Sequence, residues 1–164
     1  MQIATPIKKA STYLLLLSVM FVGTDCSGVS TRPDGRPGPQ ECPSRALEVM
    51  QRMGLAVSDR APIRIDPRSE QNPLVLLNGT IESILEDEFG ALPAGTRLYG
   101  QVWTEGPDVV IRYHEARTPH GRTYPFCGIA IDGSDGMTKR PDSPPGAGII
   151  PDAAAIVRVV DAFR

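Results

Sequence analysis

The stretch from residue 92 to residue 132 constrains the fold most, because it has the pattern of three β-strands joined by two tight turns. Between residues 97 and 103, small or apolar side chains alternate with larger polar and aromatic ones, which is typical of a strand with two different faces. Segments 105–108 and 118–121 contain the Gly and Pro residues that supply the special backbone dihedrals of turns. This meander predicts an antiparallel sheet.

Patterns elsewhere in the chain predict one helix and several more strands. Apolar side chains recur at helical spacing over residues 43–53, and Gly54 follows as a helix-ending residue. Further strands are expected over residues 61–66, 74–77, 80–85 and 153–163. The Asn78-Gly79 dipeptide predicts a hairpin between the second and third of these strands. The Pro-rich segment 133–151 is expected to form a long loop.

The composition suits one small globular domain. The chain has 164 residues, of which 22% are charged, and its formal net charge of −2 is not basic enough for a nucleic-acid surface. Sixteen Gly and sixteen Pro favour short strands and many turns over long helices. The predicted fold is therefore mostly β, a small antiparallel sandwich or partly open barrel with one N-terminal helix.

The amino terminus has the pattern of a targeting segment. Lys8 and Lys9 precede an apolar run over residues 13–23, which has about the length of a secretory signal and is too short for a comfortable transmembrane helix. The expected organisation is a signal peptide over residues 1–25, a flexible Pro/Gly-rich tether over residues 26–41, and a single β-rich domain over residues 42–164.

Cys26 directly follows the apolar run, where a lipoprotein signal places the cysteine that receives the lipid. Gly23 and Thr24 fit the small residues expected before that cysteine, whereas Asp25 does not. The prediction is lipidation at Cys26. The alternative is an ordinary signal-peptidase cut slightly downstream, in which case Cys26 leaves with the signal and the protein is secreted.

Cys42 and Cys127 remain under either alternative. An even pair of cysteines in an oxidising compartment predicts a disulfide, here closing a loop of about 85 residues. Cys127 shares a strand face with Ile129 and Ile131, so it is expected to point at the core. The alternative is a pair of free buried thiols.

Catalytic and metal-binding signatures are weak in this chain. His114, Glu115 and His120 lie close in sequence across one turn, and they are the candidates for a small hydrolase or a metal-dependent enzyme. Zinc would need three or four ligands, and no clear third ligand accompanies the two histidines. The sequence has no P-loop, no dinucleotide glycine pattern, no G-x-S-x-G elbow and no C-x-x-C. No cofactor is expected, and surface hairpin residues are the favoured interpretation.

A candidate contact patch lies on the first strand of the meander. Arg97, Tyr99 and Trp103 lie on the face opposite Leu98 and Val102. If this face is exposed, these side chains are suited to contact a partner, because aromatic residues and Arg dominate binding hot spots. If the face lies inside a barrel, they belong to the core.

Three motifs carry a resemblance to a known group of proteins. They are E-C-P at residues 41–43, PAGT followed by Gly between residues 93 and 100, and TP-x-G-x-x-YP-x-C at residues 118–127. Together with the signal and Cys26, they resemble a group of uncharacterised predicted lipoproteins from myxobacteria. Some of these similar proteins carry a serine/threonine-kinase label. The present chain has no H-R-D or D-F-G motif, and its sole lysine after residue 25, Lys139, lies in the Pro-rich segment.

The resemblance implies a compartment and not an activity. We expect an exported protein of the cell envelope, periplasmic or in the outer membrane, that contacts the membrane through a lipid at Cys26. The expected function is a non-enzymatic binding or structural module with an envelope protein or polysaccharide as partner. The alternative is the small enzyme that would use His114, Glu115 and His120.

Overall fold

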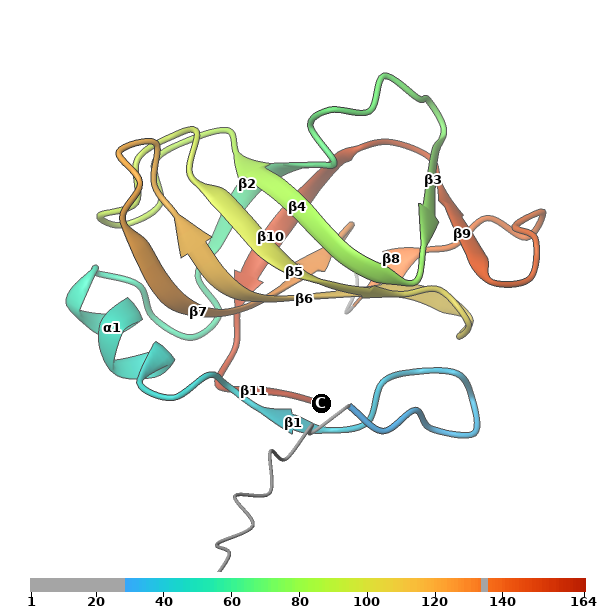
Figure 1. Ribbon diagram of the computed structural model, residues 1–164, viewed down its shortest axis with the longest axis horizontal. Coiled ribbons are helices and arrows are strands. Elements are labelled where there is room, and N and C mark those ends of the chain that lie inside the picture. Colours follow the sequence, from blue (N-terminus) through green and yellow to red (C-terminus); the bar gives the residue numbers. More distant parts are fainter. Residues whose placement is uncertain (1–28, 134–135) are drawn as a thin grey trace, which may run out of the picture.

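A computed structural model describes residues 29–133 and 136–164, and its centre is a closed antiparallel β-barrel of six strands (Figure 1). The barrel strands are β2 (Arg60–Ile65), β4 (Gly79–Leu85), β5 (Arg97–Trp103), β6 (Asp108–Arg117), β7 (Thr123–Ile131) and β10 (Ala154–Val159). They pair in the order β5-β4-β2-β10-β7-β6, and β6 pairs back onto β5. The predicted mostly β class is confirmed, with the barrel closed rather than partly open.

Shorter elements surround the barrel. They are β1 (Gln40–Glu41), α1 (Ala46–Arg52), β3 (Leu74–Leu77), β8 (Met137–Thr138), β9 (Ala147–Ile150) and β11 (Ala162–Phe163). The predicted helix is present, and the predicted final strand is split into β10 and β11. Among the described residues, no helix is long and apolar enough to cross a lipid bilayer.

The interior of the barrel is filled by side chains from alternate positions of each strand. On β5, Leu98 and Val102 point inward, and on β6 the inward residues are Val109, Ile111 and Tyr113, all of which are buried. Because alternate residues of a strand face opposite sides, Arg97, Tyr99 and Trp103 lie on the outer surface. Their assignment to a barrel core is therefore wrong.

Tyr113 places its hydroxyl inside the barrel, where it forms a hydrogen bond of 2.6 Å with Ser83 Oγ. Both side chains are fully buried. Burial raises the pKa of the Tyr113 phenol well above its ordinary value, and the hydrogen bond with Ser83 opposes this shift only in part. The phenol therefore stays neutral in the folded protein at a pH where it would ionise in the unfolded chain.

We expect the free energy of unfolding of Tyr113→Phe to fall less at alkaline pH than that of the unaltered chain. The stability linked to this raised pKa is fully present below pH ~10 and is lost as the pH rises above that value, because only the unfolded phenol releases its proton. At neutral pH the variant should lose about 1 kcal/mol, since the Ser83 hydroxyl loses its partner. Urea unfolding of both proteins at neutral and alkaline pH measures this. The other titratable groups are present in both proteins, so only Tyr113 can make their pH dependence differ. If both proteins lose the same free energy of unfolding between neutral and alkaline pH, the prediction is contradicted.

Barrel closure depends on a glycine where β5 meets β6. The pairing register shifts between Tyr99 and Gly100, and a Cβ atom at Gly100 would lie 2.1 Å from the Arg112 carbonyl oxygen. That distance is far below van der Waals contact, and the obstructing atom belongs to the backbone. Only glycine lets the two strands approach this closely without a backbone shift.

We expect Gly100→Ala to lower the free energy of unfolding by about 2 kcal/mol, because the added methyl group forces the two closing strands apart. Chemical unfolding measures the change. Gly136→Ala is the matched control, since the nearest heavy atom to its added Cβ would lie 3.6 Å away, an ordinary contact. Equal stabilities of the two variants would contradict the close approach at Gly100.

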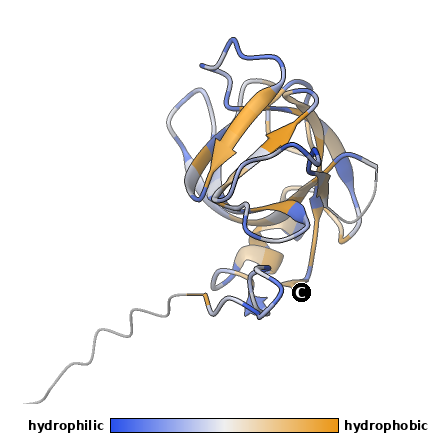
Figure 2. Ribbon diagram, turned by 90° about the vertical axis from the view of Figure 1, so that its right-hand side faces the viewer, coloured by the Kyte–Doolittle hydropathy of each residue, from blue (hydrophilic) through white to orange (hydrophobic). Residues whose placement is uncertain are grey.

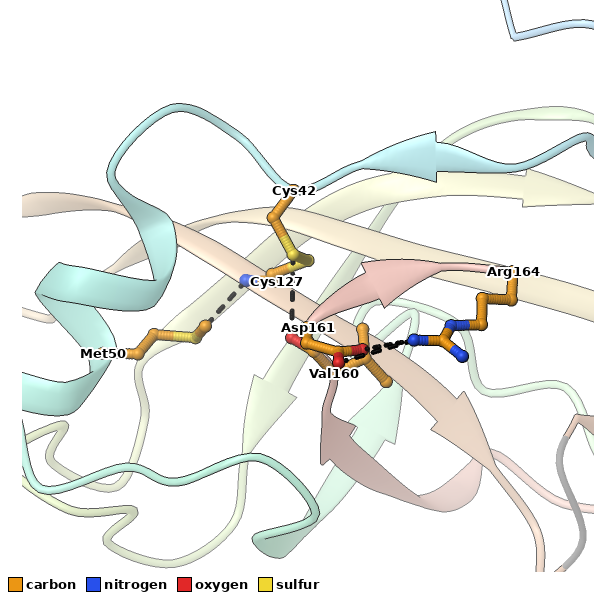
Figure 3. The surroundings of a disulfide bond; sticks show 6 residues. All are labelled: Cys42, Met50, Cys127, Val160, Asp161 and Arg164. Carbon is orange, nitrogen blue, oxygen red and sulfur yellow. Dashed lines mark hydrogen bonds and ion pairs between the residues drawn. A yellow bond between two sulfur atoms is a disulfide. The ribbon is translucent and has the colours of Figure 1, made fainter.

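Helix α1 packs on the outer face of β7, where the disulfide also lies (Figure 3). Cys42 precedes the helix and bonds with Cys127 of β7, with the Cα atoms 5.5 Å apart, so the predicted disulfide is confirmed. The predicted direction of Cys127 needs correction. Tyr113 pairs with Gly128, so Phe126 and not Cys127 shares the inward face. Cys127 is nevertheless fully buried, because α1 covers it.

A second, two-stranded sheet forms from β3 and β9 at one end of the barrel. These hydrophobic strands face the viewer in Figure 2. Strand β9 arises within the segment predicted as a long loop. The hairpin predicted at Asn78-Gly79 is wrong, because β3 pairs with β9 and not with β4. Strand β3 is also not fully buried, since Val75 and Leu77 are 44% and 66% exposed.

Residues 29–41, which we call the hook, pack beneath the barrel (Figure 1). Within the hook the Gly38 amide donates to the Ser30 carbonyl oxygen at 2.6 Å. Strand β1, at its end, pairs with β11 in the segment 160–164, which we call the tail. This part of the chain differs from the flexible tether predicted over residues 26–41. The predicted signal peptide and Cys26 lie outside the described residues.

Candidate functional site

A groove of about 710 Å³ lies between the hook, the tail and the outer surface of the barrel. Five arginines from four parts of the chain line it. Arg32 and Arg36 belong to the hook, Arg112 and Arg158 to strands β6 and β10, and Arg164 to the tail. We call this site the arginine groove, because the barrel register and the packing of both terminal segments gather these side chains in one place.

Strand register explains why two of the arginines are neighbours. Arg112 on β6 and Arg158 on β10 both pair with Ile129 of β7, which runs between them. The three residues therefore form one row on the outer face of the barrel. Val110 lies two residues before Arg112 on the same face, so Ile129 and Val110 give the groove an apolar floor between charged side chains.

Arg112 connects the barrel with both terminal segments. Its guanidinium donates to the Gly38 carbonyl at 2.8 Å, to the Pro37 carbonyl at 3.3 Å and to the backbone oxygen of Arg164 at 3.3 Å. The side chain is only 3% exposed. The hook and the tail thus both contact this buried cation of β6.

Two aromatic rings complete the surroundings of Arg112. The guanidinium carbon lies 5.4 Å from the centre of the Trp103 ring and 5.3 Å from that of Phe163, within the range of cation–π interactions. Burial, together with the nearby charge of Arg32, lowers the pKa of Arg112 to about 10. The guanidinium of Arg112 therefore contacts backbone oxygens of the hook and the tail and the faces of two aromatic rings.

Two aspartates also line the arginine groove. Asp108 forms an ion pair with Arg36, and Asp161 forms one with Arg164 at 3.4 Å. Among the described residues, the lining therefore has more arginines than aspartates, in a chain whose formal net charge is −2. Such a local excess raises the concentration of anions at the site.

The contact patch predicted on β5 is on the surface, but its side chains are already engaged. Arg97 forms an ion pair with Glu82. The guanidinium of Arg117 lies 5.1 Å from the centre of the Tyr99 ring. Trp103 is half-buried and stacks with Arg112, as described above. Of the three, Trp103 lies nearest to the arginine groove, because it contacts one of the residues that line it.

The candidate enzyme residues are spread over β6 and the turn that follows. His114 is exposed and lines a second hollow of about 550 Å³, to which neither Glu115 nor His120 contributes. Glu115 forms an ion pair with Arg117 at 3.1 Å. His120 is exposed in the turn between β6 and β7. Within residues 29–133 and 136–164, no three His, Cys, Asp or Glu side chains are grouped to hold a metal ion.

No local pattern in the sequence singles out the arginine groove. Its residues are scattered from position 32 to position 164, and the hook that supplies two of them resembles a free linker. One signal was present, namely 14 arginines against three lysines in the whole chain. Arginine is the cation of choice where charge must be held in a fixed geometry.

The chain matches no known protein-family model, and no curated protein is similar to it.

Proposed function

We propose that this protein is exported to the cell envelope, is anchored by a lipid at Cys26, and acts there as a non-enzymatic binding or structural module. The observation that carries the proposal is the disulfide between Cys42 and Cys127. Disulfides form and persist in oxidising compartments and are rare in the cytosol. The disulfide therefore agrees with the signal-like pattern of residues 1–25 and with the resemblance to predicted lipoproteins.

The arrangement of the described residues supports a binding role. The interior of the barrel is filled by its own side chains, so a ligand would bind on the outer surface. The arginine groove lies on that surface. A concave site with convergent polar groups is the usual form of a binding site. An envelope protein or an envelope polysaccharide is the proposed partner.

The intact mass of the protein from its native membrane fraction tests this proposal. Samples are alkylated with and without prior reduction. We expect the mass of a chain that begins at Cys26 and carries acyl groups, with two thiols that react only after reduction. A Cys26→Ser variant is the control, and it should lose the acyl mass and leave the membrane fraction.

Two results would count against the proposal. A mass that retains residues 1–25, with all three cysteines reactive without reduction, would place the protein in a reducing compartment. A disulfide-bonded chain that starts after Cys26 and is found in the medium would mean secretion without an anchor, and it would remove the lipid from the proposal.

A further inference from the structure

We propose that the arginine groove binds carboxylate groups of an acidic saccharide. The inference rests on the proposed binding role and names the ligand class and the site. It is carried by four arginines of the groove, namely Arg32, Arg36, Arg112 and Arg164. Arg158 also lines the groove, but it is already engaged in another interaction, and the proposal does not depend on it.

The first supporting observation is that the positive charge of the groove is not balanced. Arg32 is exposed, and its guanidinium forms no hydrogen bond or ion pair within the described parts of the chain. Arg112 is buried close by, and its guanidinium contacts the backbone oxygens of Pro37, Gly38 and Arg164. Two neighbouring cations repel each other unless an anion lies near both, so this part of the groove is prepared for a negative group.

The second observation is that the groove offers acceptors as well as donors. Arg36 with Asp108, and Arg164 with Asp161, present guanidinium and carboxylate groups side by side. A saccharide needs such a mixture, because each hydroxyl group both donates and accepts hydrogen bonds. Two aspartates in the groove disfavour a densely charged ligand, such as a nucleic acid or a phosphate dianion, by like-charge repulsion.

The third observation is the shape and floor of the groove. Its volume of about 710 Å³ falls within the range of roughly 300–1,000 Å³ that is usual for ligand sites. Val110 and Ile129 form an apolar floor that suits the C–H faces of sugar rings. The planar guanidinium of Arg32, which is exposed, matches the geometry of a carboxylate, to which it can donate two parallel hydrogen bonds.

Titration calorimetry of the full chain, with its disulfide formed, tests the proposal at low salt. The probe is an α-linked tetramer of galacturonate, and its methyl ester is the control ligand that lacks only the charges. We expect the acid to bind and the ester to bind at least about tenfold more weakly, because a hydrogen bond to a charged group is worth about that factor. The affinity for the acid should also fall with added salt.

Matched variants assign the binding to the groove. Arg32→Gln should weaken acid binding about tenfold and leave the melting temperature unchanged, since the side chain is exposed. Arg122→Gln removes one positive charge from the turn at the far end of β6 and β7 and should bind like the unaltered chain. The pair separates recognition in the groove from a general effect of net charge.

Several results would overturn the proposal. They are equal binding of the acid and the ester, no binding of either, no effect of Arg32→Gln, and an equal loss with Arg122→Gln. A further arm uses vesicles that contain anionic phospholipid. Binding to these vesicles without binding to galacturonate would replace the saccharide with a lipid head group. None of these results bears on the mass measurement, so failure of the ligand class can be told apart from failure of export and anchoring.

Discussion

Replacing both Cys42 and Cys127 by alanine should lower the free energy of unfolding by about 4 kcal/mol. The disulfide closes a loop with a sequence separation of 85 residues, and without it the unfolded chain gains the corresponding conformational freedom. In a chain of this size the melting temperature should fall by roughly 10 °C or more. Thermal and urea unfolding under non-reducing conditions measure the change.

A reductant supplies the control for the disulfide prediction. It should lower the melting temperature of the unaltered chain and leave that of the double alanine variant where it is. If the reductant lowers both melting temperatures equally, the stabilisation comes from another source. If the double variant has the same melting temperature as the unaltered chain, the disulfide is not needed for stability. Packing of α1 on β7 would then be sufficient to hold the two elements together.

The second large effect is expected at Arg112. Arg112→Met keeps an unbranched stem between the two aromatic rings but removes every donor, so the carbonyl oxygens of Pro37 and Gly38 lose their partner. We expect a loss of about 3 kcal/mol, because buried acceptors without donors are costly. Arg112→Lys should be intermediate, since an ammonium group cannot reproduce the fork of donors.

Hydrogen exchange locates the damage that Arg112→Met causes. The amides that lose protection should be those of the hook and of the β1–β11 pair, with the barrel strands affected far less. Arg122→Met is the matched control, because it changes an exposed arginine in a turn and should alter stability by less than about 0.5 kcal/mol. Unchanged protection of the hook in Arg112→Met would contradict a role of Arg112 in holding the hook and the tail against β6.

Local sequence patterns were sufficient for the β class and for most of the strands. Alternation over residues 97–103 predicted the two faces of β5, and the two cysteines that follow the predicted signal and Cys26 predicted the disulfide. Asn78-Gly79 misled, because the dipeptide is a strong hairpin signal on its own. In the folded chain the Asn78 side chain instead accepts a hydrogen bond of 2.7 Å from the Thr104 amide, so the chain turns a corner towards a different partner.

The groove and the hook could not be predicted because both depend on contacts between distant residues. The hook has no apolar period, and its position is fixed by a guanidinium some 74 residues further along the chain. In the sequence Arg112 alternates with Ile111 and Tyr113, a pattern that normally indicates a solvated side chain on the outer face of a strand. Nothing local in the sequence distinguishes an exposed arginine from one that a folded-back terminus will cover.

The disulfide also determines how a mechanical load would travel through the molecule. A pull on the chain ahead of Val29 would first peel the hook and β1 away from the tail and then arrive at Cys42. From there the disulfide passes the tension directly to Cys127 in β7. The tension therefore bypasses the segment between the two cysteines, which contains five of the six barrel strands wholly or in part. A load applied ahead of Val29 would therefore not unravel the barrel from its N-terminal side.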